Sequence, residues 1–422
     1  MREMKDSGIE WIGKIPEEWT KDKAIRLFNI IGSGTTPKNI TSDFPCVNWI
    51  QSGDINGSLI SSCKNNVSES IISQYSALKI YAAPFIVIAM YGASVGNTSI
   101  SLIDGCVNQA CCVLSASIYN LNYAFYAIKS SQNYLIRKAI GGGQPNISQD
   151  TIKQLWLPLP ALHEQKRIAA FLDAECAEID AVLEKTRASI EEYKKLKQAV
   201  ITQAVTKGIR GDRPMKNSGS VWFEEIPCNW VMKRIKYLFH IKKDIAGKEG
   251  YTVLSITQSG IKPKDLSKNE GQIAANYSQY QLLAPGDFAM NHMDLLTGWV
   301  DISKYSGVTS PDYRVFVLDD TEKNDSSYYL YLMQMCYFNR IFYGLGQGVS
   351  GMGRWRLQAD KFMNFPVVVP PVDEQKEIVS YLNEKCKQLD TLICNKQQYL
   401  TEIENYKKSL IYEYVTGKKE VV

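Results

Sequence analysis

The sequence predicts an α+β fold in which two globular domains alternate with two long helices, as a pseudo-two-fold internal repeat. Two observations support this prediction: short motifs recur about 210 residues apart, and each half ends in an uninterrupted heptad-like pattern. A length of 422 residues, with 45% hydrophobic and 22% charged residues, suits two or three domains with well-buried cores. We expect globular domains at 1–158 and 209–368, and long helices at 159–208 and 369–418.

The repeat is visible at both ends of each half. DSGIEW at 6–11 returns 211 residues later as NSGSVW at 217–222. LPALHEQK at 159–166 returns 210 residues later as VPPVDEQK, and this offset continues without a gap through the rest of the small segment. The stretches between these motifs have similar lengths but little similarity in sequence. The chain therefore consists of two unlike large segments, each followed by a similar small one.

The two small segments are predicted to be long helices that pack against each other. Apolar residues recur every seven positions without an intervening glycine or proline, and prolines precede each segment. About 44 residues at about 1.5 Å each give a rod of roughly 65 Å, which cannot bury its apolar seam alone. The residues expected at the contact are Ile179, Val182, Tyr193, Leu196, Val200, Leu389, Leu392, Tyr399, Ile403, Tyr406 and Leu410.

The large segments combine short strands, helices and polar loops. The apolar runs at 85–89 and 314–318 predict strands, because each is short, rich in β-branched or aromatic residues and bounded by turn residues. Aromatic-rich stretches at 123–140 and 327–342 predict helices. Loops rich in glycine, serine and asparagine lie between them.

Composition excludes several classes of protein. The net charge of +4 permits nucleic-acid binding only weakly. There is no apolar run long enough to cross a membrane and no signal-peptide core, so we expect a cytoplasmic protein without membrane contact. The ten cysteines include no CxxC pair, and the three histidines lie far apart, so no metal site is expected.

The sequence shows no assembled catalytic site. It lacks a Walker A motif, the tetrapeptide of amino-methyltransferases and a zinc-binding HExxH motif. GQGVSG at 346–351 matches GxGxxG, but it follows a predicted helix, so a flexible loop is preferred over a dinucleotide site. We therefore expect no catalytic residues and no cofactor in this chain.

The chain resembles, over its whole length, the specificity subunit of type I DNA restriction–modification systems. The resemblance rests on the PxxxEQxxI motif that starts each small segment at 160–168 and 370–378, and on the Val-Thr pair that ends each. The first domain adds WIGKIPxxW at 11–19, GTTP at 34–37, WIxxGD at 49–54 and GASVG at 92–96. Each motif is weak by itself, whereas their order, spacing and duplication are specific.

The resemblance implies two target-recognition domains separated by an antiparallel pair of coiled-coil-like helices. Each domain would read one half of a bipartite asymmetric site in double-stranded DNA, and the helices would set the half-site spacing and dock two modification subunits. The chain would be non-catalytic by itself. The modification (adenine methyltransferase) and restriction (motor-nuclease) subunits would use S-adenosylmethionine, ATP and Mg. The alternatives are a self-sufficient DNA-modifying enzyme and a two-headed scaffold that binds ligands other than DNA.

Polar residues of the glycine-rich loops are the candidates for DNA contact, because their side chains hydrogen-bond to base edges while loop amides bind phosphates. Each could instead cap a loop, and His292 equally suits a buried polar role. Arg354 and Arg356 are favoured because they flank Trp355 after a glycine-dense loop. The candidates are Lys38, Tyr91, Ser94, Asn97, Gln144 and Asn146 in the first domain, and Asn291, His292, Arg314, Arg354 and Arg356 in the second.

Overall fold

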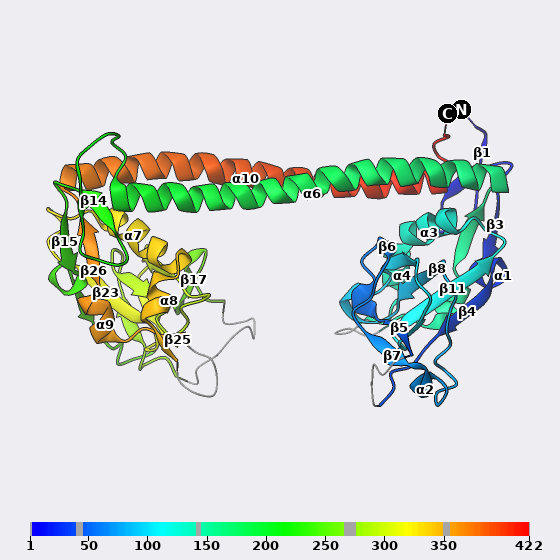
Figure 1. Cartoon of the computed structure of the whole chain (residues 1–422), viewed down its shortest axis with the longest axis horizontal. Helices are drawn as coiled ribbons and strands as arrows, with labels where there is room; N and C mark the ends of the chain where they lie inside the picture. The colour runs from blue at the N-terminus through cyan, green and yellow to red at the C-terminus, as the bar shows by residue number, and fades with distance from the viewer. Residues whose placement is uncertain (1, 39–44, 141–144, 266–275, 349–354, 422) are drawn as a thin grey trace. The chain divides into compact units, whose positions relative to one another are not determined.

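The chain folds as two compact units, each with a globular part and a segment of two long helices (Figure 1). The computed structural model describes residues 2–38, 45–140, 145–265, 276–348 and 355–421. Unit 1 comprises Met1–Arg187 and Gln398–Val422, and unit 2 comprises Ala188–Gln397. The α+β class and the internal repeat expected from the sequence are confirmed.

The two long helices are α6, Leu162–Lys207, and α10, Val372–Val415, of 46 and 44 residues. Their lengths agree with the uninterrupted heptad-like patterns. Acidic residues occupy the first turn of each, Glu164 in α6 and Asp373 with Glu374 in α10. Negative charge is favourable there because the helix macrodipole places partial positive charge at the amino end.

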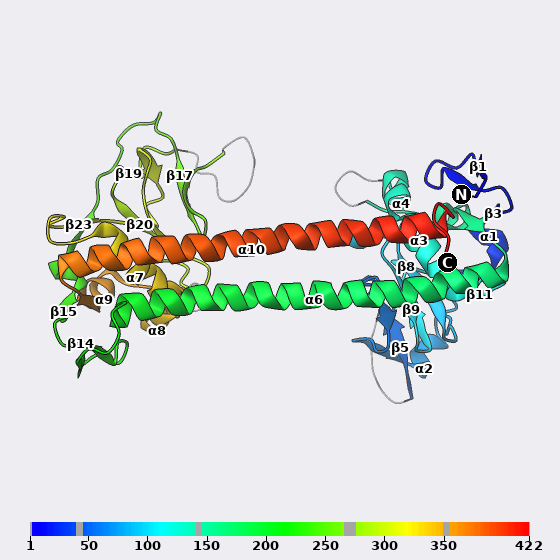
Figure 2. The same cartoon turned by 90° about the horizontal axis from the view of Figure 1, so that it is seen from above.

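Within each unit the segments of α6 and α10 lie side by side and run in opposite directions (Figure 2). In unit 1 the rings of Phe171 and Tyr414 are 4.4 Å apart, and the Lys407 ammonium lies 2.6 Å from Asp180. Residue numbers therefore rise along α6 as they fall along α10. The equivalent contacts in unit 2 are Tyr193 with Lys396 and Lys197 with Asp390.

The globular part of unit 1 is built on a five-stranded sheet in the order β4-β11-β8-β9-β6 and a three-stranded sheet in the order β10-β5-β7. Among the described strands of the larger sheet, β6 pairs with β9 in parallel and the other pairings are antiparallel. Its elements are β1 Met4–Asp6, β2 Lys14–Pro16, β3 Thr20–Lys23, α1 Ala24–Leu27, β4 Phe28–Ser33, β5 Cys46–Ile50, η1 Ser52–Asp54, β6 Leu59–Ile60, β7 Asn66–Ser68, α2 Glu69–Ile72, β8 Phe85–Ala89, η2 Gly92–Ser94, β9 Thr98–Ser101, β10 Gly105–Val107, β11 Cys111–Ser117, α3 Leu121–Ser130, α4 Gln132–Lys138, α5 Gln149–Lys153 and β12 Trp156–Leu159.

Strand β8 is buried on both faces, which explains its continuous apolar sequence. Ile86 and Ile88 join a core shared with α3 and the long helices. Phe85, Val87 and Ala89 point to a second core between the two sheets. A strand covered on both faces needs apolar residues at every position rather than at alternate ones. The strand predicted at 85–89 is therefore found with its predicted bounds.

The globular part of unit 2 is built on a four-stranded antiparallel sheet in the order β16-β23-β20-β21. Shorter pairs of strands, β17-β18 and β19-β22, accompany it. Its elements are β13 Met215–Asn217, β14 Glu225–Pro227, β15 Val231–Arg234, η3 Ile235–Tyr237, β16 Phe239–Lys242, β17 Leu254–Thr257, β18 Gly260–Pro263, β19 Gln281–Leu283, β20 Phe288–Met290, β21 Val300–Ile302, β22 Gly307–Thr309, β23 Arg314–Leu318, α7 Ser326–Phe338, α8 Ile341–Leu345, β24 Gln347–Gly348, β25 Trp355–Arg356, α9 Ala359–Asn364 and β26 Pro366–Val369.

The two globular parts share a strand order although their sequences differ. The order β4-β11-β8-β9 in unit 1 corresponds to β16-β23-β20-β21 in unit 2, with antiparallel pairing throughout. The pair Ile86–Leu114 takes the place of Phe288–Phe316. Each of these side chains is fully buried, so the same framework is kept with different core residues.

Each predicted aromatic-rich helix is broken in the structure. The helix expected at 123–140 divides at Ser131, whose hydroxyl donates to the carbonyl of Ile128 at 2.7 Å. The helix expected at 327–342 divides where Arg340 adopts a left-handed φ of 57°. The amide of Ser131 is shared between the carbonyls of Ala127 and Ile128, which tightens the end of the first helix, whereas the left-handed backbone at Arg340 interrupts the second helix.

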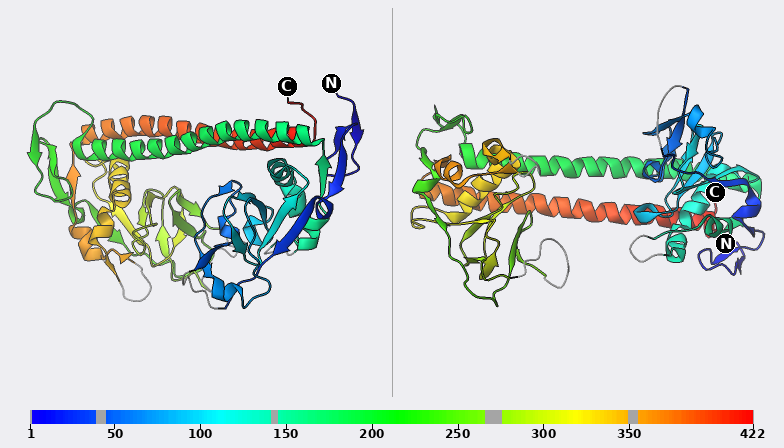
Figure 3. Two further views of the ribbon diagram at one scale, coloured as in Figure 1. Left: turned by 45° about the vertical axis from the view of Figure 1, so that its right-hand side comes forward. Right: turned by 90° about the horizontal axis from the view of Figure 1, so that it is seen from below.

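The duplicated Glu-Gln pair at the start of each long helix holds the globular part in place. Glu374 accepts a 2.9 Å hydrogen bond from the indole of Trp230, and Gln375 accepts one from the amide of Asp325. Tyr328 on α7 donates to the carbonyl of Val205 on α6. Figure 3 shows α3 and α7 beside the long helices in their respective units. The equivalent contacts in unit 1 are Trp19 to Glu164, Asn120 to Gln165 and Tyr123 to Val415.

Candidate DNA interface

In unit 1, two loops meet beyond the end of strand β8. The amide of Ile147 donates to the carbonyl of Met90, and the amide of Gly92 donates to the carbonyl of Pro145, both at 2.9 Å. The loop at 90–97 and the segment at 145–148 are therefore joined by their backbones. We call them the unit 1 loop pair.

The unit 1 loop pair brings together four of the candidates for DNA contact. Tyr91 and Asn146 form an isolated antiparallel bridge, and both side chains are exposed. The hydroxyl of Ser94 donates to the carbonyl of Tyr91 at 3.2 Å. The Asn97 side chain is held inside the fold, because it donates to the carbonyl of Ile55 and accepts from Gln132. Tyr91 and Asn146 are thus the members free to face a ligand.

The GASVG motif is required by the backbone of this loop. Gly92 and Gly96 have φ angles of 71° and 78°, in the left-handed region that side chains disfavour. A Cβ atom at Gly96 would also lie 3.0 Å from Cγ of Gln132. The motif therefore shapes the loop, and the neighbouring Tyr91 supplies the exposed side chain.

Unit 2 carries an equivalent loop pair, formed by 291–299 and the hairpin of β24 and β25. The amide of Leu357 donates to the carbonyl of His292 at 2.9 Å, which matches the bond from Ile147 to Met90 in unit 1. The hairpin is anchored by Trp355, whose ring stacks on Tyr343 with centroids 5.2 Å apart. We call these segments the unit 2 loop pair.

Arg314 lies inside the fold, whereas the sequence analysis placed it among the loop residues that could contact a base. Its side chain is buried, and Nη2 donates to the carbonyl of Leu357 at 2.9 Å. The guanidinium carbon lies 4.9 Å from the centre of the Phe362 ring. Burial lowers the pKa of Arg314 to about 10, which leaves the group charged at neutral pH. Arg314 thus fixes the base of the hairpin that carries Arg356.

His292 and Asn291 are engaged in the loop rather than presented at its surface. The His292 ring is buried, and Nδ1 has no hydrogen-bond partner among the described residues. Burial, with the nearby charges of Arg314 and Arg356, lowers the pKa of His292 to about 3, so the ring is neutral. Asn291 caps its own loop, because its side-chain oxygen accepts from the amides of Met293 and Asp294. Arg356 is exposed.

The remaining candidates are not joined to the loop pairs. Lys38 is exposed, and its backbone amide donates to the hydroxyl of Tyr75 at 3.2 Å. Within the described ranges, no hydrogen bond links Lys38 to the loop at 90–97. Gln144 and Arg354 lie outside the described residues.

About half of the residues expected at the helix contact are exposed. Leu389 and Leu410 are buried, and Ile179, Tyr193, Val200 and Ile403 are half-buried. Exposed fractions of 39–55% are found for Val182, Leu196, Leu392, Tyr399 and Tyr406. Leu183, which directly follows Val182, is buried, and so is Ile190, seven residues further along α6. Six of the eleven expected residues are thus buried or half-buried, and the other five are exposed.

Gln132 and Trp355 support the two loop pairs, but the sequence analysis did not name either as a site residue. Gln132 fixes Asn97 through a 2.8 Å hydrogen bond to its side-chain oxygen. Trp355 donates to the carbonyl of Tyr343. The available signal was the glycine-rich sequence at 344–348, since a Cβ at Gly346 would collide with the Trp355 ring. Glycines that crowd an aromatic residue indicate a close backbone approach.

Two absences hold for the part of the chain that the structure describes. None of its helices combines the length and apolar character needed to cross a membrane. No group of three or more His, Cys, Asp or Glu side chains is placed to bind a metal ion.

The structure defines a protein with two recognition modules, in which one framework is used twice and carries loop pairs of unlike sequence. Residues 16–192 and 227–405 match the family model described as the type I restriction modification DNA specificity domain. These two matches cover most of the chain, which therefore belongs to this family. The resemblance inferred from the duplicated motifs is confirmed.

Relatives of known function agree with this assignment. The chain is 23% identical over 318 residues to the type I restriction enzyme MjaVIII specificity subunit of Methanocaldococcus jannaschii, covering 71% of this chain and 70% of the relative. It is 22% identical to the MjaIX specificity subunit of the same organism, covering 97% and 95%. A solved chain from a study of type I system assembly and conformational transition has the same fold, with a TM-score of 0.69, 15% identity and coverage of 95% and 98%. The chain is thus a DNA sequence-recognition subunit, and neither alternative function is favoured.

Proposed function

We propose that each unit reads one half of a bipartite, asymmetric site in double-stranded DNA through its own loop pair. The observation that carries this proposal is the equivalence of the two loop pairs, fixed by matching backbone bonds from Ile147 to Met90 and from Leu357 to His292. The exposed residues differ, with Tyr91 and Asn146 in unit 1 and Arg356 in unit 2. Reading different sequences requires different side chains at base edges on a common scaffold.

The long helices are proposed to set the spacing between the half-sites and to dock two modification subunits. Apolar residues that the helix contact leaves exposed support the second role. In unit 1 these are Val182 on α6 with Tyr399 and Tyr406 on α10. In unit 2 they are Leu392 and Leu196, the counterparts of Val182 and Tyr406, whereas Tyr399 corresponds to Ser189. Exposed aromatic and aliphatic residues in such a stripe are typical of protein interfaces. We call these residues the docking stripes.

Duplication of the stripes suits two identical partners. Val182 corresponds to Leu392, and Leu196 corresponds to Tyr406, through the repeat offset of 210 residues. Each unit therefore presents a similar surface. A chain that is its own approximate repeat can bind two copies of one protein in the manner of a symmetric assembly.

The chain is proposed to act on DNA in the cytoplasm, without catalytic residues, metal or cofactor of its own. The modification subunits would supply adenine methylation with S-adenosylmethionine, and the restriction subunits would supply cleavage and translocation with ATP and Mg. The described loop pairs contain tyrosine, serine, asparagine and arginine side chains that suit binding to DNA.

A domain exchange tests the proposal. Residues 20–155 would be replaced by the same region of a related specificity subunit, and adenine methylation would be mapped across the genome of cells expressing the chimera. We expect one half of the methylated sequence to change while the other half and the spacing stay the same. Simultaneous change of both halves would refute separate reading by the two units.

A further inference from the structure

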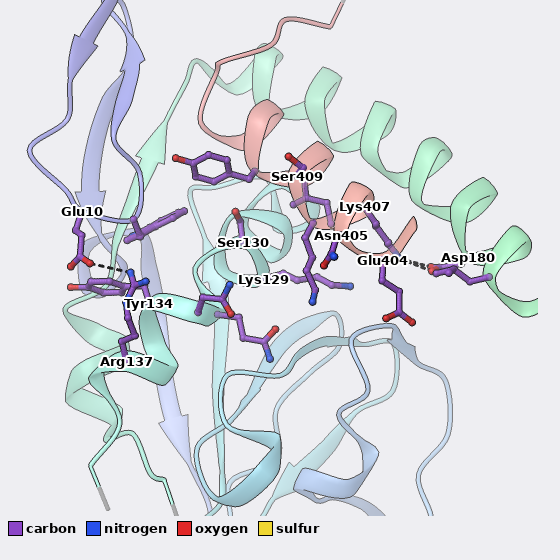
Figure 4. Close-up of a pocket in the computed structure, with 17 residues that line it drawn as sticks. Glu10, Lys129, Ser130, Tyr134, Arg137, Asp180, Glu404, Asn405, Lys407 and Ser409 are labelled. Carbon is purple, nitrogen blue, oxygen red and sulfur yellow. Dashed lines mark hydrogen bonds and ion pairs between the residues drawn. The ribbon is translucent and has the colours of Figure 1, made fainter. Parts of the chain in front are cut away.

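Unit 1 contains a cleft of about 660 Å³ between the α3–α4 region and the facing segments of α6 and α10 (Figure 4). One wall carries Lys129 and Gln132, and the opposite wall carries Asn405 and Lys408 from α10. All lining residues belong to unit 1. The cleft is therefore a feature of one compact body.

The charges of the cleft do not cancel. Each of its three acids is already paired with a cation: Glu10 with Arg137 at 3.1 Å, Asp180 with Lys407 at 2.6 Å and Glu404 with Arg187 at 2.6 Å. Lys129 and Lys408 also line the cleft, and neither forms an ion pair with any acid in the described ranges. Two ammonium groups are left to face an added anion.

Lys129 is the more enclosed of the two. Its Nζ donates to the carbonyl of Gly57 at 2.6 Å and lies 5.1 Å from the centre of the Phe125 ring. In Figure 4 the side chain extends toward the α10 residues of the opposite wall. An ammonium has three donors, and a carbonyl satisfies only one of them. Burial, together with the charge of Lys407, lowers the pKa of Lys129 to about 8.

The corresponding position in unit 2 lacks both cations. Tyr126 and Tyr331 hold equivalent places, since each donates to a residue on the adjoining long helix, Asp173 or Asn383. Lys129 lies three residues after Tyr126, and Gln334 lies three residues after Tyr331, so Lys129 corresponds to Gln334. Through the repeat offset of 210 residues, Lys408 corresponds to Gln198. The unpaired positive charge is therefore particular to unit 1.

We propose that this cleft receives an aspartate or glutamate side chain of the modification subunit that docks on unit 1. The inference rests on the proposed function, and it deepens that function by naming the contact. Two ammonium groups, with amide donors beside them, suit the two oxygens of a carboxylate. The cleft also adjoins a docking stripe, because Tyr406 lies three residues before Ser409, which lines the cleft on the same helix.

Two consequences follow from this assignment. The two modification subunits bind unequally, with the tighter site on unit 1. Binding also reaches the unit 1 loop pair, since Gln132 lines the cleft and donates to Asn97 at 2.8 Å. A carboxylate in the cleft would thus lie one hydrogen bond away from the loop that carries Tyr91.

The experiment is a titration of the full-length chain with its modification subunit, followed by native mass spectrometry to resolve complexes with one and two partners. K408Q places in unit 1 the residue that unit 2 has at the equivalent position. We expect the tighter dissociation constant to rise roughly tenfold in K408Q and the weaker one to stay unchanged. K185Q, which alters an exposed lysine of α6 outside the cleft, is the matched control and should leave both constants unchanged.

K129Q provides a second variant, and its thermal unfolding shows whether the unit remains folded. The acid groups and cations around Lys129 are Asp180 and Cys176 on α6 and Lys407 on α10. A bound carboxylate raises the pKa of Lys129, so the tighter site should weaken as pH rises through about 8 in the unmodified chain. Folded K129Q should lack this pH dependence.

The outcomes separate the two proposals. Two equal sites in the unmodified chain, or a K408Q variant with both constants unchanged, would overturn the assignment of the cleft. Weaker binding of duplex DNA by K408Q in the absence of partner, with partner binding intact, would identify DNA phosphates as the occupant and also overturn it. Failure of the unmodified chain to bind any modification subunit would instead count against the proposed function.

Discussion

The indole N–H of Trp230 donates a 2.9 Å hydrogen bond to the carboxylate of Glu374, and both residues are buried. Trp19 and Glu164 repeat this bond in unit 1 at the same distance. Arg213 also pairs with Glu374. A buried charge is tolerated when several donors surround it, and this arrangement ties the first strands of each globular part to the start of a long helix.

Replacement of Glu374 by glutamine is expected to destabilise unit 2. The amide keeps the shape of the side chain but leaves Arg213 without its charged partner, at a cost of about 1–3 kcal/mol. Urea unfolding followed by tryptophan fluorescence measures the change. E377Q is the control, because the Arg210–Glu377 pair is exposed and contributes about 1 kcal/mol or less. Equal losses in both variants would show that the buried bonds contribute no more than a surface pair.

The same carboxylate is expected to make the unfolding free energy of unit 2 depend on pH in the acidic range. Burial opposes ionisation of Glu374, but the hydrogen bonds from Trp230 and Arg213 outweigh it and hold the pKa below its ordinary value of 4.5. A group with a lowered folded pKa contributes fully above its unfolded pKa, and the contribution is lost as pH falls through the folded pKa. The difference in unfolding free energy between the unmodified chain and E374Q should therefore shrink below about pH 4.5. A difference that stayed constant would assign the effect to packing.

Arg314 is expected to control the second half-site without touching DNA. In R314M the carbonyl of Leu357 loses its donor and Phe362 loses the stacked guanidinium, so the hairpin that presents Arg356 loosens. Methylation mapping should then show weaker discrimination in the half read by unit 2 and an unchanged half read by unit 1. R314K keeps the charge but not the planar stack, so it should resemble R314M. Full discrimination in both variants would contradict a positioning role.

Arg356 is expected to affect binding without affecting stability. The side chain is exposed, so R356A should change the unfolding free energy by no more than about 0.5 kcal/mol. A contact to guanine would make its loss worth about 1–3 kcal/mol at a single base position. A phosphate contact would instead weaken binding to all sequences alike. The slope of the logarithm of the binding constant against the logarithm of salt concentration would then fall in magnitude by about one. K236A removes another exposed cation of unit 2 and should show neither effect.

The sequence predicted the architecture well because the repeat and the heptad spacing constrain long stretches of chain. Strand β8 follows from a short continuous apolar run, and helices α6 and α10 follow from long heptad-like segments without glycine or proline. The site was predicted less well. Arg314 is the clearest case, because an arginine that starts a buried strand looks like a loop residue in the sequence until Phe362, 48 positions later, is seen to cover it. Contacts of such long range are not encoded in local patterns.

The exposed apolar residues of the long helices show the same limit and lead to the last prediction. Tyr406 was expected in the helix contact, yet it is 55% exposed on α10. Y406S should therefore leave the unfolding of unit 1 nearly unchanged and weaken the binding of a modification subunit roughly tenfold, as truncation of an interface aromatic does. I118S, which alters a residue of unit 1 with 69% exposure outside the long helices, is the control and should leave this affinity unchanged. Because unit 2 has Leu196 at the position equivalent to Tyr406, L196S should weaken the other binding event. If Y406S lowered stability without changing affinity, Tyr406 would be a packing residue after all.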